Sequence, residues 1–522
     1  MDMRALLKDL EERREQIRRM GGAERVDKQH SRGKLTARER FAKFFDDGVF
    51  FEVGMHGTQM GLSAGSDGKD RPPADAVVCG FGKVDGRMVC AAAYDFTVKG
   101  GSIGQTGEEK VTRMRHMALR GRWPMVWFID SAGARIDPGS THADAISLFA
   151  GSGHLFREQV IMSGVVPQVA AMVGPGAAGT AYIPGLADFV PMVKEIGSMA
   201  LGGPPLVRAM TGEDISEQEL GGSKVHATKS GVGDVEVADD AACIAIVKRY
   251  LSFFPSSCDE QPPALPVTDP IDRREESLLD LLPENPRKAY DMYKLIAAVV
   301  DHGEWLDIKP RWARTIITCL ARIGGQSVGV VASQPNHMGG ILDVDSSDKA
   351  ARFIQICDAF NVPLVFLQDV PGFMIGSKVE HEGIIRHGAK MLHAMAAATV
   401  PKISVVVRKA YGAGYYVMCG RAYEPDLIVS WPTAEISVMG PEGMVGIAAR
   451  KLFGDAPPPP EMKQAIIQQI QANIDIYKVA GWGLVDDVID PRDTRRAIAW
   501  GLELARHKHL ERPAKKRGIM PV

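Results

Sequence analysis

The sequence predicts an α/β protein built from two tandem domains that are related by internal duplication. The stretch PMVWFIDSAGAR at residues 124–135 recurs as PLVFLQDVPGFM at residues 363–374. In each copy a proline begins an apolar run that ends at an aspartate, Asp130 or Asp369. A short apolar run bounded by proline and by a turn containing glycine is typical of a buried parallel strand that leads into a loop.

The similarity extends beyond these two strands. The first copy is followed by a helical pattern, by Val-Pro with a second apolar run, and by the small-residue run GPGAAG at residues 174–179. The second copy is followed by the same succession, which ends in YGAG at residues 411–414. Because a repeat constrains the architecture of both copies, we expect two strand–loop–helix–strand units of similar size.

Length and local composition suggest where the domains lie. At 522 residues the chain exceeds what one ordinary hydrophobic core supports. The stretch at residues 259–293 is rich in Pro, Asp and Glu, as linkers are. We expect an N-terminal domain at residues 1–262, a linker at residues 263–293 and a C-terminal domain at residues 294–522.

The overall composition excludes several classes of function. Hydrophobic residues make up 45% of the chain and the net charge is −2, which gives no sign of bulk affinity for nucleic acid or for an anionic membrane. No apolar run approaches the ~20 residues that span a bilayer. The seven cysteines are scattered without a CxxC spacing, which argues against a zinc ribbon and for reduced thiols. We therefore expect a cytoplasmic protein without a metal site.

Three segments before the first copy have predictable structure. VDGR at residues 84–87 predicts a β-hairpin ahead of the parallel strands. The stretch at residues 98–121 begins as a glycine loop and becomes a helix, where Thr106 and Glu109 could form a capping box. SRGKLTARERF at residues 31–41 is basic, so it is either a solvated helix start or a contact to phosphate.

The glycine loops offer backbone amides rather than a side-chain nucleophile. Ser131 lies in DSAGA rather than GxSxG, and the GxGxxG match at residues 174–179 is not at the first strand of a nucleotide-binding unit. Small residues that open a helix expose N–H groups that can bind an oxyanion. Ala132-Gly133 and Ala413-Gly414 are the candidates. Close packing of strand on helix is the structural alternative, but two such runs in a duplicated frame favour a pair of oxyanion holes.

Longer motifs identify a family resemblance. They are SRGKLTARER, DFTVKGGSIG, DSAGARI, SSDKAARFIQICDAFNVPLVFLQDVPGF, GIIRHGAKMLHA, VPKISVVVRKAYGAGYYVM and WPTAEISVMG. In these motifs, which are spread over nearly the whole chain, the sequence resembles the carboxyltransferase β subunit of biotin-dependent acyl-CoA carboxylases, the propionyl-CoA and methylcrotonyl-CoA carboxylase family. The resemblance implies a crotonase-like fold in each half. It also implies a hexameric ring, with an active site between the N half of one subunit and the C half of another.

The resemblance also implies a reaction. CO₂ passes from carboxybiotin to the α-carbon, or the vinylogous γ-carbon, of an acyl-CoA, and negative charge develops on the thioester oxygen and on the biotin ureido oxygen. The AMKM biotinylation sequence and a Gly-rich ATP-binding loop are both absent. Biotin must therefore be carried by a partner, the biotin carboxylase and biotin carboxyl carrier α subunit.

Residue roles follow from the resemblance, with the N half as the acyl-CoA side and the C half as the biotin side. Ala132 and Gly133 would hold the thioester oxygen, and Ala413 and Gly414 the biotin oxygen. The residues implied in substrate binding are Gly179, Gly412 and Tyr416.

Two positions depart from the family pattern. Relatives usually have glycine at Ala132, so the first hole requires a negative φ there. Propionyl-type relatives carry aspartate at Tyr416, which is expected to line the acyl pocket or, alternatively, to pack in the core. Two other functions stay open: a non-catalytic structural β-like subunit, and the carboxyltransferase subunit of a biotin-dependent decarboxylase.

Overall fold

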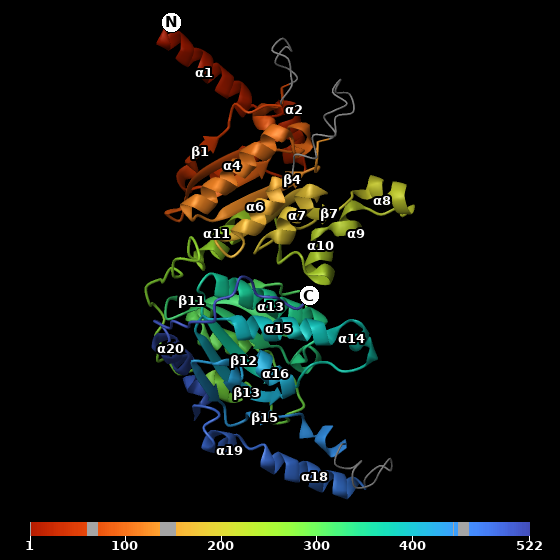
Figure 1. Cartoon of the computed structure of the whole chain (residues 1–522), viewed down its shortest axis with the longest axis vertical. Helices are drawn as coiled ribbons and strands as arrows, with labels where there is room; N and C mark the ends of the chain where they lie inside the picture. The colour runs from red at the N-terminus through yellow and green to blue at the C-terminus, as the bar shows by residue number, and fades with distance from the viewer. Residues whose placement is uncertain (1, 60–70, 136–152, 442, 447–458) are drawn as a thin grey trace. The chain divides into compact units, whose positions relative to one another are not determined.

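The chain divides into two compact units, Met1–Gln261 and Pro262–Val522 (Figure 1). The computed structural model describes residues 2–59, 71–135, 153–441, 443–446 and 459–522. Each unit is built around an eight-stranded mixed sheet with helices on its faces. The predicted α/β class with an internal duplication is confirmed.

The sheet of unit 1 has the strand order β1-β2-β3-β4-β5-β6-β8, and β7 pairs with β5. Its first three strands are antiparallel, and pairing is parallel from β3 onward. The predicted hairpin joins β2 to β3, with Asp85 and Gly86 at positive φ in the turn. The bounds are β1 Phe50–Val53, β2 Val77–Val84, β3 Arg87–Tyr94, β4 Met125–Ser131, β5 Gln168–Ala177, β6 Pro191–Val193, β7 Ser198–Ala200 and β8 Val235–Val237.

The sheet of unit 2 repeats this arrangement in the order β9-β10-β11-β12-β13-β14-β16, and β15 pairs with β13. The strands β9 to β11 are again antiparallel, and the rest pair in parallel. The bounds are β9 Trp305–Ile308, β10 Ile316–Ile323, β11 Gln326–Ser333, β12 Leu364–Val370, β13 Lys402–Tyr411, β14 Leu427–Ser430, β15 Glu435–Ser437 and β16 Asp487–Val488.

Strand register shows which residues of the two units correspond. Both central strand pairs contain an irregularity at the same point, after which Ser131 pairs with Gly176 in unit 1 and Val370 pairs with Ala410 in unit 2. The short strands β7 and β15 then pair with β5 and β13 in the same register. Residue 133 therefore corresponds to residue 372, and residues 178–180 correspond to residues 412–414.

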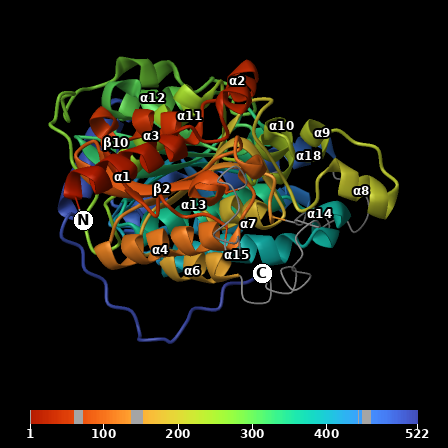
Figure 2. The same ribbon diagram turned by 90° about the horizontal axis from the view of Figure 1, so that it is seen from above.

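Helices cover both faces of the unit 1 sheet. Figure 2 shows α3 and α11 on one side of the strands and α4 and α6 on the other. The apolar interior joins residues of α4, such as Met114, to β4 residues such as Trp127. The helices are α1 Met3–Arg18, α2 Ala23–Ser31, α3 Ala37–Phe44, α4 Gln105–Gly121, α6 His154–Met162, α7 Gly179–Leu186, α8 Pro204–Thr211, α9 Glu217–Gly221, α10 Ser223–Val225 and α11 Asp240–Ser252.

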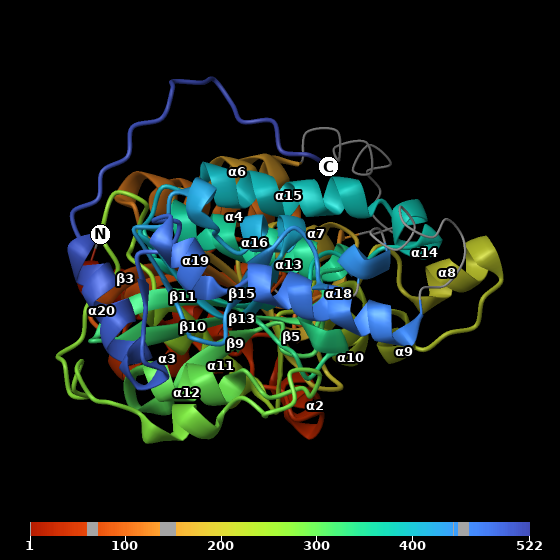
Figure 3. The ribbon, with the colours of Figure 1, turned by 90° about the horizontal axis from the view of Figure 1, so that it is seen from below.

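In unit 2 the helix α12 lies on one side of the sheet and the pair α13 and α15 on the other (Figure 3). The helices are α12 Tyr293–Val299, α13 Val344–Ala359, α14 Ser377–His381, α15 Ile384–Ala397, α16 Gly412–Val417, α18 Pro460–Asn473, α19 Ile476–Gly481 and α20 Thr494–Leu504. The stretch expected to be a linker contributes Leu278, Leu281, Tyr290 and Met292 to the hydrophobic core of this unit.

The predicted capping box at the start of α4 is wrong. The helix begins at Gln105 with Gly104 as its N-cap, so Thr106 lies inside the first turn. The backbone N–H of Gly107 instead donates to Oδ2 of Asp75 at 2.7 Å. Asp75 lies in the segment that precedes β2. A distant carboxylate therefore takes the place of the local cap that the sequence suggested.

Candidate functional site

In unit 1 the loop after β4 meets the junction of β5 with α7. Gly133 has φ +93°, and a Cβ built on it would lie 2.7 Å from the carbonyl oxygen of Ala177. Only glycine fits this conformation and this close approach without strain. The loop therefore lies directly against the first turn of α7, which begins at Gly179.

Unit 2 repeats this contact. Gly372 has φ +122°, and a Cβ built on Gly414 would lie 3.1 Å from the Cα of Gly372. The helix that follows, α16, begins at Gly412. Each unit therefore brings one glycine loop against one helix start, both at the carboxyl ends of adjacent parallel strands.

The Ala132 amide is not a free donor. Its φ is not positive, as an oxyanion hole at this residue requires. Its N–H, however, donates to the Gly100 carbonyl at 2.9 Å. The corresponding residue of unit 2 is Pro371, which has no N–H. The Gly133 N–H donates to Ser131 Oγ at 3.1 Å, a hydroxyl that can rotate away.

The equivalence assumed between Ala132-Gly133 and Ala413-Gly414 is wrong. The sheet register aligns Ala413-Gly414 with Gly179-Thr180. The first amides of a helix have no intrahelical acceptor. No described residue accepts a hydrogen bond from the amides of Gly179 or Ala413. The structure thus offers two matched pairs of donors, Gly133 with Gly179 and Gly372 with Ala413.

Tyr416 lies at the surface of unit 2 rather than in its core. It is 47% exposed, and its ring stacks on Tyr423 with centroids 6.1 Å apart. The aligned residue in unit 1, Tyr182, is 50% exposed and makes an edge contact with Phe156 at 5.5 Å. An exposed tyrosine thus follows the helix start in both units.

The two repeated aspartates anchor the loops. Asp130 is fully buried and accepts from Lys34 Nζ at 2.5 Å, Gln29 Nε2 at 2.7 Å and Arg40 Nη1 at 3.1 Å. Asp369 is also fully buried and accepts from Arg408 Nε at 3.0 Å. Both buried carboxylates are therefore paired with cationic side chains, and these contacts fix the ends of their strands.

The basic segment at residues 31–41 is mostly structural. Lys34 and Arg40 pair with Asp130, and Arg38 pairs with Glu52 at 2.6 Å. Burial lowers the pKa of Lys34, although the Asp130 carboxylate acts against that effect. Neither alternative drawn from the sequence describes these three side chains, because each is paired with a carboxylate of unit 1.

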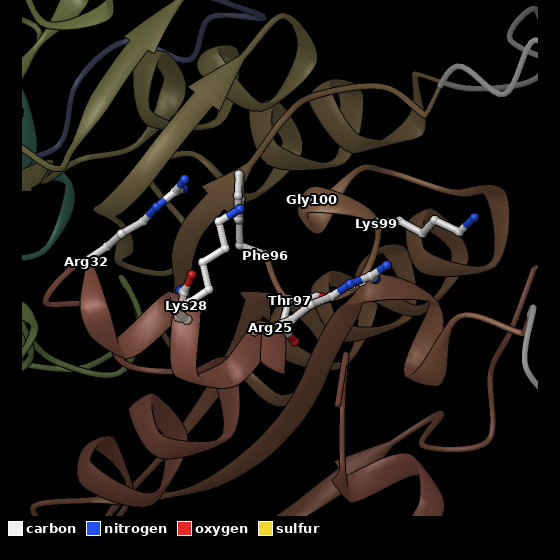
Figure 4. Close-up of a pocket in the computed structure, with 8 residues that line it drawn as sticks. Arg25, Lys28, Arg32, Phe96, Thr97, Lys99 and Gly100 are labelled. Atoms are coloured by element: carbon white, nitrogen blue, oxygen red, sulfur yellow. Dashed lines mark hydrogen bonds between the residues drawn. The ribbon is translucent and has the colours of Figure 1, made fainter. Parts of the chain in front are cut away.

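A basic pocket of about 340 Å³ opens beside this cluster (Figure 4). Arg25 and Lys28 come from α2, Arg32 follows that helix, and Lys99 comes from the turn Lys99–Gly101 on the other side. Phe96 supplies an aromatic wall, and the remaining lining residues are Gln29, Thr97 and Gly100. Cationic groups around an aromatic ring can bind a phosphorylated aromatic ligand.

The pocket is linked to the glycine loop through short contacts. The Gly100 carbonyl accepts from Ala132, the residue before Gly133. Gln29 lines the pocket and donates to Asp130 at the end of β4. Sequence reasoning missed Arg25, Lys28 and Lys99, although DFTVKGG, the motif containing Phe96 and Lys99, had been singled out.

Within the described part of the chain, no group of three or more His, Cys, Asp or Glu side chains is arranged to hold a metal ion. No helix among the described residues is long and apolar enough to cross a membrane.

Comparison with known proteins identifies the family. A model of the carboxyl transferase domain matches residues 28–520. The chain belongs to the carboxyl transferase family. It is 45% identical over 520 residues to the methylmalonyl-CoA carboxyltransferase 12S subunit of Propionibacterium freudenreichii subsp. shermanii, covering 99% of this chain and 98% of that one.

Two other relatives are named as subunits of a decarboxylase and of a carboxylase. The α subunit of methylmalonyl-CoA decarboxylase from Propionigenium modestum is 42% identical over 99% of both chains. The β chain of propionyl-CoA carboxylase from Roseobacter denitrificans is 41% identical over the full length of both.

The solved structures agree with these matches. The transcarboxylase 12S crystal structure, described as a hexamer with methylmalonyl-coenzyme A and methylmalonic acid bound, superposes with a TM-score of 0.93 at 44% identity over the full length of both chains. A single-chain, multi-domain long-chain acyl-CoA carboxylase superposes with a TM-score of 0.80 at 28% identity, over 96% of this chain and 50% of that one. The predicted fold of two tandem crotonase-like domains is confirmed.

Proposed function

We propose that this chain is the carboxyltransferase subunit of a biotin-dependent acyl-CoA carboxylase. In this proposal unit 1 binds the acyl-CoA, and a partner α subunit with biotin carboxylase and biotin carrier functions delivers the carboxyl group to unit 2. Three relatives with 41–45% identity over nearly the whole chain carry names of enzymes that act on acyl-CoA. The free cysteines among the described residues fit a reducing cytoplasm.

The observation that carries the proposal is the basic pocket and its position beside the Gly133 loop. Coenzyme A has an adenine ring and three phosphate groups, which match Phe96 and the cations Arg25, Lys28, Arg32 and Lys99. Because Gly100 both lines the pocket and accepts from Ala132, a ligand anchored there can extend toward the loop. Remote binding of this kind holds a reacting group in place.

In unit 1 the amides of Gly133 and Gly179 are the proposed donors to the thioester oxygen. This pair replaces Ala132-Gly133, because the Ala132 N–H is engaged by Gly100. Negative charge grows on that oxygen as the α-carbon loses its proton. Amides fixed before the reaction stabilise such charge at little reorganisation cost, and losing one donor typically costs about 3 kcal/mol.

Unit 2 fits the ureido group of biotin in the same way. The amides of Gly372, Ala413 and Gly414 have no acceptor among the described residues, so they can receive a carbonyl oxygen. Carboxybiotin, carried by the partner chain, would supply CO₂ by cleavage of its N–carboxyl bond, and the ureido nitrogen left behind would accept the α-proton. The chain's own task there is to hold the ureido oxygen as charge develops. Tyr416 is proposed to line the acyl pocket.

The two donor sets must act on one reacting pair, so we propose that unit 1 of one copy works with unit 2 of another copy in a hexamer. The transcarboxylase 12S structure is described as a hexamer assembly. A non-catalytic structural β-like subunit is the first alternative, although both matched donor pairs are intact in this chain.

The reverse reaction is a second candidate, favoured by the identity of 42–43% to two methylmalonyl-CoA decarboxylase α subunits. The experiment that separates these functions combines the purified chain with a carboxybiotin donor and a panel of acyl-CoAs. Carboxyl transfer to an acyl-CoA supports the carboxylase. Transfer only from dicarboxylic acyl-CoAs to biotin supports the decarboxylase, and no transfer in either direction supports the structural subunit.

A further inference from the structure

Unit 1 contains an ion pair beside the Gly133 loop. The Arg135 guanidinium donates to the carboxylate of Asp75 through Nη1, and to the Ser102 hydroxyl and carbonyl at 3.1 and 2.9 Å. The Asp75 side chain is fully buried and that of Arg135 is 9% exposed. The pair therefore ties the residue two positions after Gly133 to the segment that precedes β2.

The backbone around the loop is the same in both units, but the ion pair is not. Ile103 donates to the Gly133 carbonyl at 2.8 Å and accepts from the Arg135 N–H at 3.0 Å. Leu342 makes the same two bonds in unit 2, where Met374 occupies the position of Arg135. Unit 2 therefore holds its loop by the same two backbone hydrogen bonds. With Met374 at this position, it has no counterpart of the Arg135–Asp75 ion pair, which we call the clamp.

Asp75 is held in an unusual conformation. It lies in a left-handed turn with Ala74 and Ala76, at φ of 50°, 48° and 62° in chain order. Consecutive non-glycine residues in this conformation are strained and persist only when the surroundings hold them. Lys110 Nζ donates to the Ala74 carbonyl at 2.7 Å. At the corresponding residues 313–315 of unit 2, only Ala313 has a positive φ.

Only one carboxylate oxygen of Asp75 is used to cap the start of α4. Oδ2 accepts from Gly107, the third residue of α4, whereas the third residue of α13, Ser346, donates to its own N-cap at 2.8 Å. Oδ1 is left for Arg135. A Cβ built on Gly104 would lie 2.6 Å from Asp75 Oδ2, so glycine at this N-cap leaves the space that the ion pair occupies.

We propose that Arg135, held by Asp75, is a positioning residue for carboxyl transfer. It fixes the Gly133 amide against the start of α7 and so aligns the donor pair of unit 1, while unit 2 needs no such clamp. This inference rests on the proposed function, in which Gly133 donates to the thioester oxygen. A donor displaced by about 1 Å can cost on the order of 100-fold in rate.

The test is Arg135→Met, which gives unit 1 the side chain found at the aligned position of unit 2. Hydrogen exchange of the amides at residues 131–135 should become at least ~10-fold faster, while exchange at residues 370–374 stays unchanged. With propionyl-CoA as the probe, kcat should fall by about 10–100-fold while KM changes less than about 3-fold. Gly104→Ala, which keeps both charges but crowds the pair, should act in the same direction.

Arg274→Met is the matched control, because it removes an ion pair with Asp490 at 2.8 Å on the surface of unit 2. It should leave both readouts at parental values. Unchanged exchange at residues 131–135 in Arg135→Met would overturn the clamp whatever the activity. Faster exchange with full kcat would show that the pair is structural only. If the parent transfers no carboxyl group to any acyl-CoA, the proposed function fails, and the exchange measurement alone decides whether the clamp exists.

Discussion

Ala178 and Gly412 occupy the same position in the two units, and both have left-handed backbones with φ of 51° and 54°. Ala178 is the N-cap of α7, and Gly412 is the first residue of α16, directly after the end of β13. Glycine adopts this conformation freely, but alanine does not. With ψ at −118°, Ala178 carries strain on the order of 1–3 kcal/mol that Gly412 avoids.

The first prediction concerns that strain. Ala178→Gly should raise the free energy of unfolding by about 1 kcal/mol, because the relieved strain exceeds the entropy cost of one glycine. Urea unfolding of the parent and the variant measures the difference. Ala181→Gly, two residues into α7, is the control and should destabilise the chain by about 0.5–1 kcal/mol. Equal losses in both variants would show that Ala178 is not strained.

The second prediction concerns the glycine loops. A Cβ on Gly133 would meet the Ala177 carbonyl at 2.7 Å, so Gly133→Ala should displace the donor amide and lower kcat by about 100–1,000-fold. Gly372→Ala places its Cβ no closer than 3.8 Å to a neighbour, so only its positive φ opposes it and the loss should be smaller. Equal kcat values for the two variants would contradict the packing argument.

The third prediction tests the basic pocket. Lys28→Ala should raise KM for an acyl-CoA by about 10-fold, the effect of losing one charge-assisted contact to phosphate. KM for the matching acyl-pantetheine, which lacks the nucleotide, should not change. Lys294→Ala, an exposed lysine of unit 2, serves as the control. A similar rise in KM for both substrates would place the phosphates elsewhere.

The fourth prediction concerns Tyr416. If its exposed ring lines the acyl pocket, Tyr416→Asp should change the ratio of kcat/KM between short and branched acyl-CoAs by about 10–200-fold. Tyr423→Phe, which keeps the stacking partner but removes its hydroxyl, should leave the ratio unchanged. A folded Tyr416→Asp variant with parental ratios across the panel would remove Tyr416 from the pocket.

The fifth prediction concerns pH. Burial raises the pKa of Asp95, although hydrogen bonds from the Thr97 hydroxyl and N–H act against it. A carboxyl whose pKa is higher in the folded state adds stability in acid that is lost as pH rises through that pKa. Asp95→Asn cannot titrate, so its free energy of unfolding relative to the parent should rise as the pH increases above about 4, the ordinary pKa of an aspartate. Gln334, a neutral amide, stands at the aligned position of unit 2. A difference that stays constant as the pH increases would contradict the raised pKa.

The duplicated fold could be predicted because local sequence patterns determine its repeated elements. Proline, an apolar run, an aspartate and a glycine turn recur in order, and each predicts the same local structure wherever it occurs. The hairpin around Asp85 and Gly86 was predicted for the same reason.

The matching of the glycine runs could not be read from composition. Ala132-Gly133 resembles Ala413-Gly414 in residue type, but the register irregularity near the ends of β4 and β12 fixes the true correspondence, with Gly179 aligned to Ala413. The ion pairs of Asp130 could not be predicted from the sequence either. Lys34 and Arg40 meet Asp130 only after the chain has folded, as their sequence separations of 96 and 90 residues show.

The most direct test of this account is carboxyl transfer by the purified chain. An isotopically labelled carboxyl group on carboxybiotin is followed into a panel of acyl-CoAs, with Gly133→Ala run alongside the parent. The account predicts that label enters at least one acyl-CoA with the parent and that the rate falls about 100–1,000-fold with the variant. Absence of label from every acyl-CoA, or equal rates for parent and variant, would contradict it.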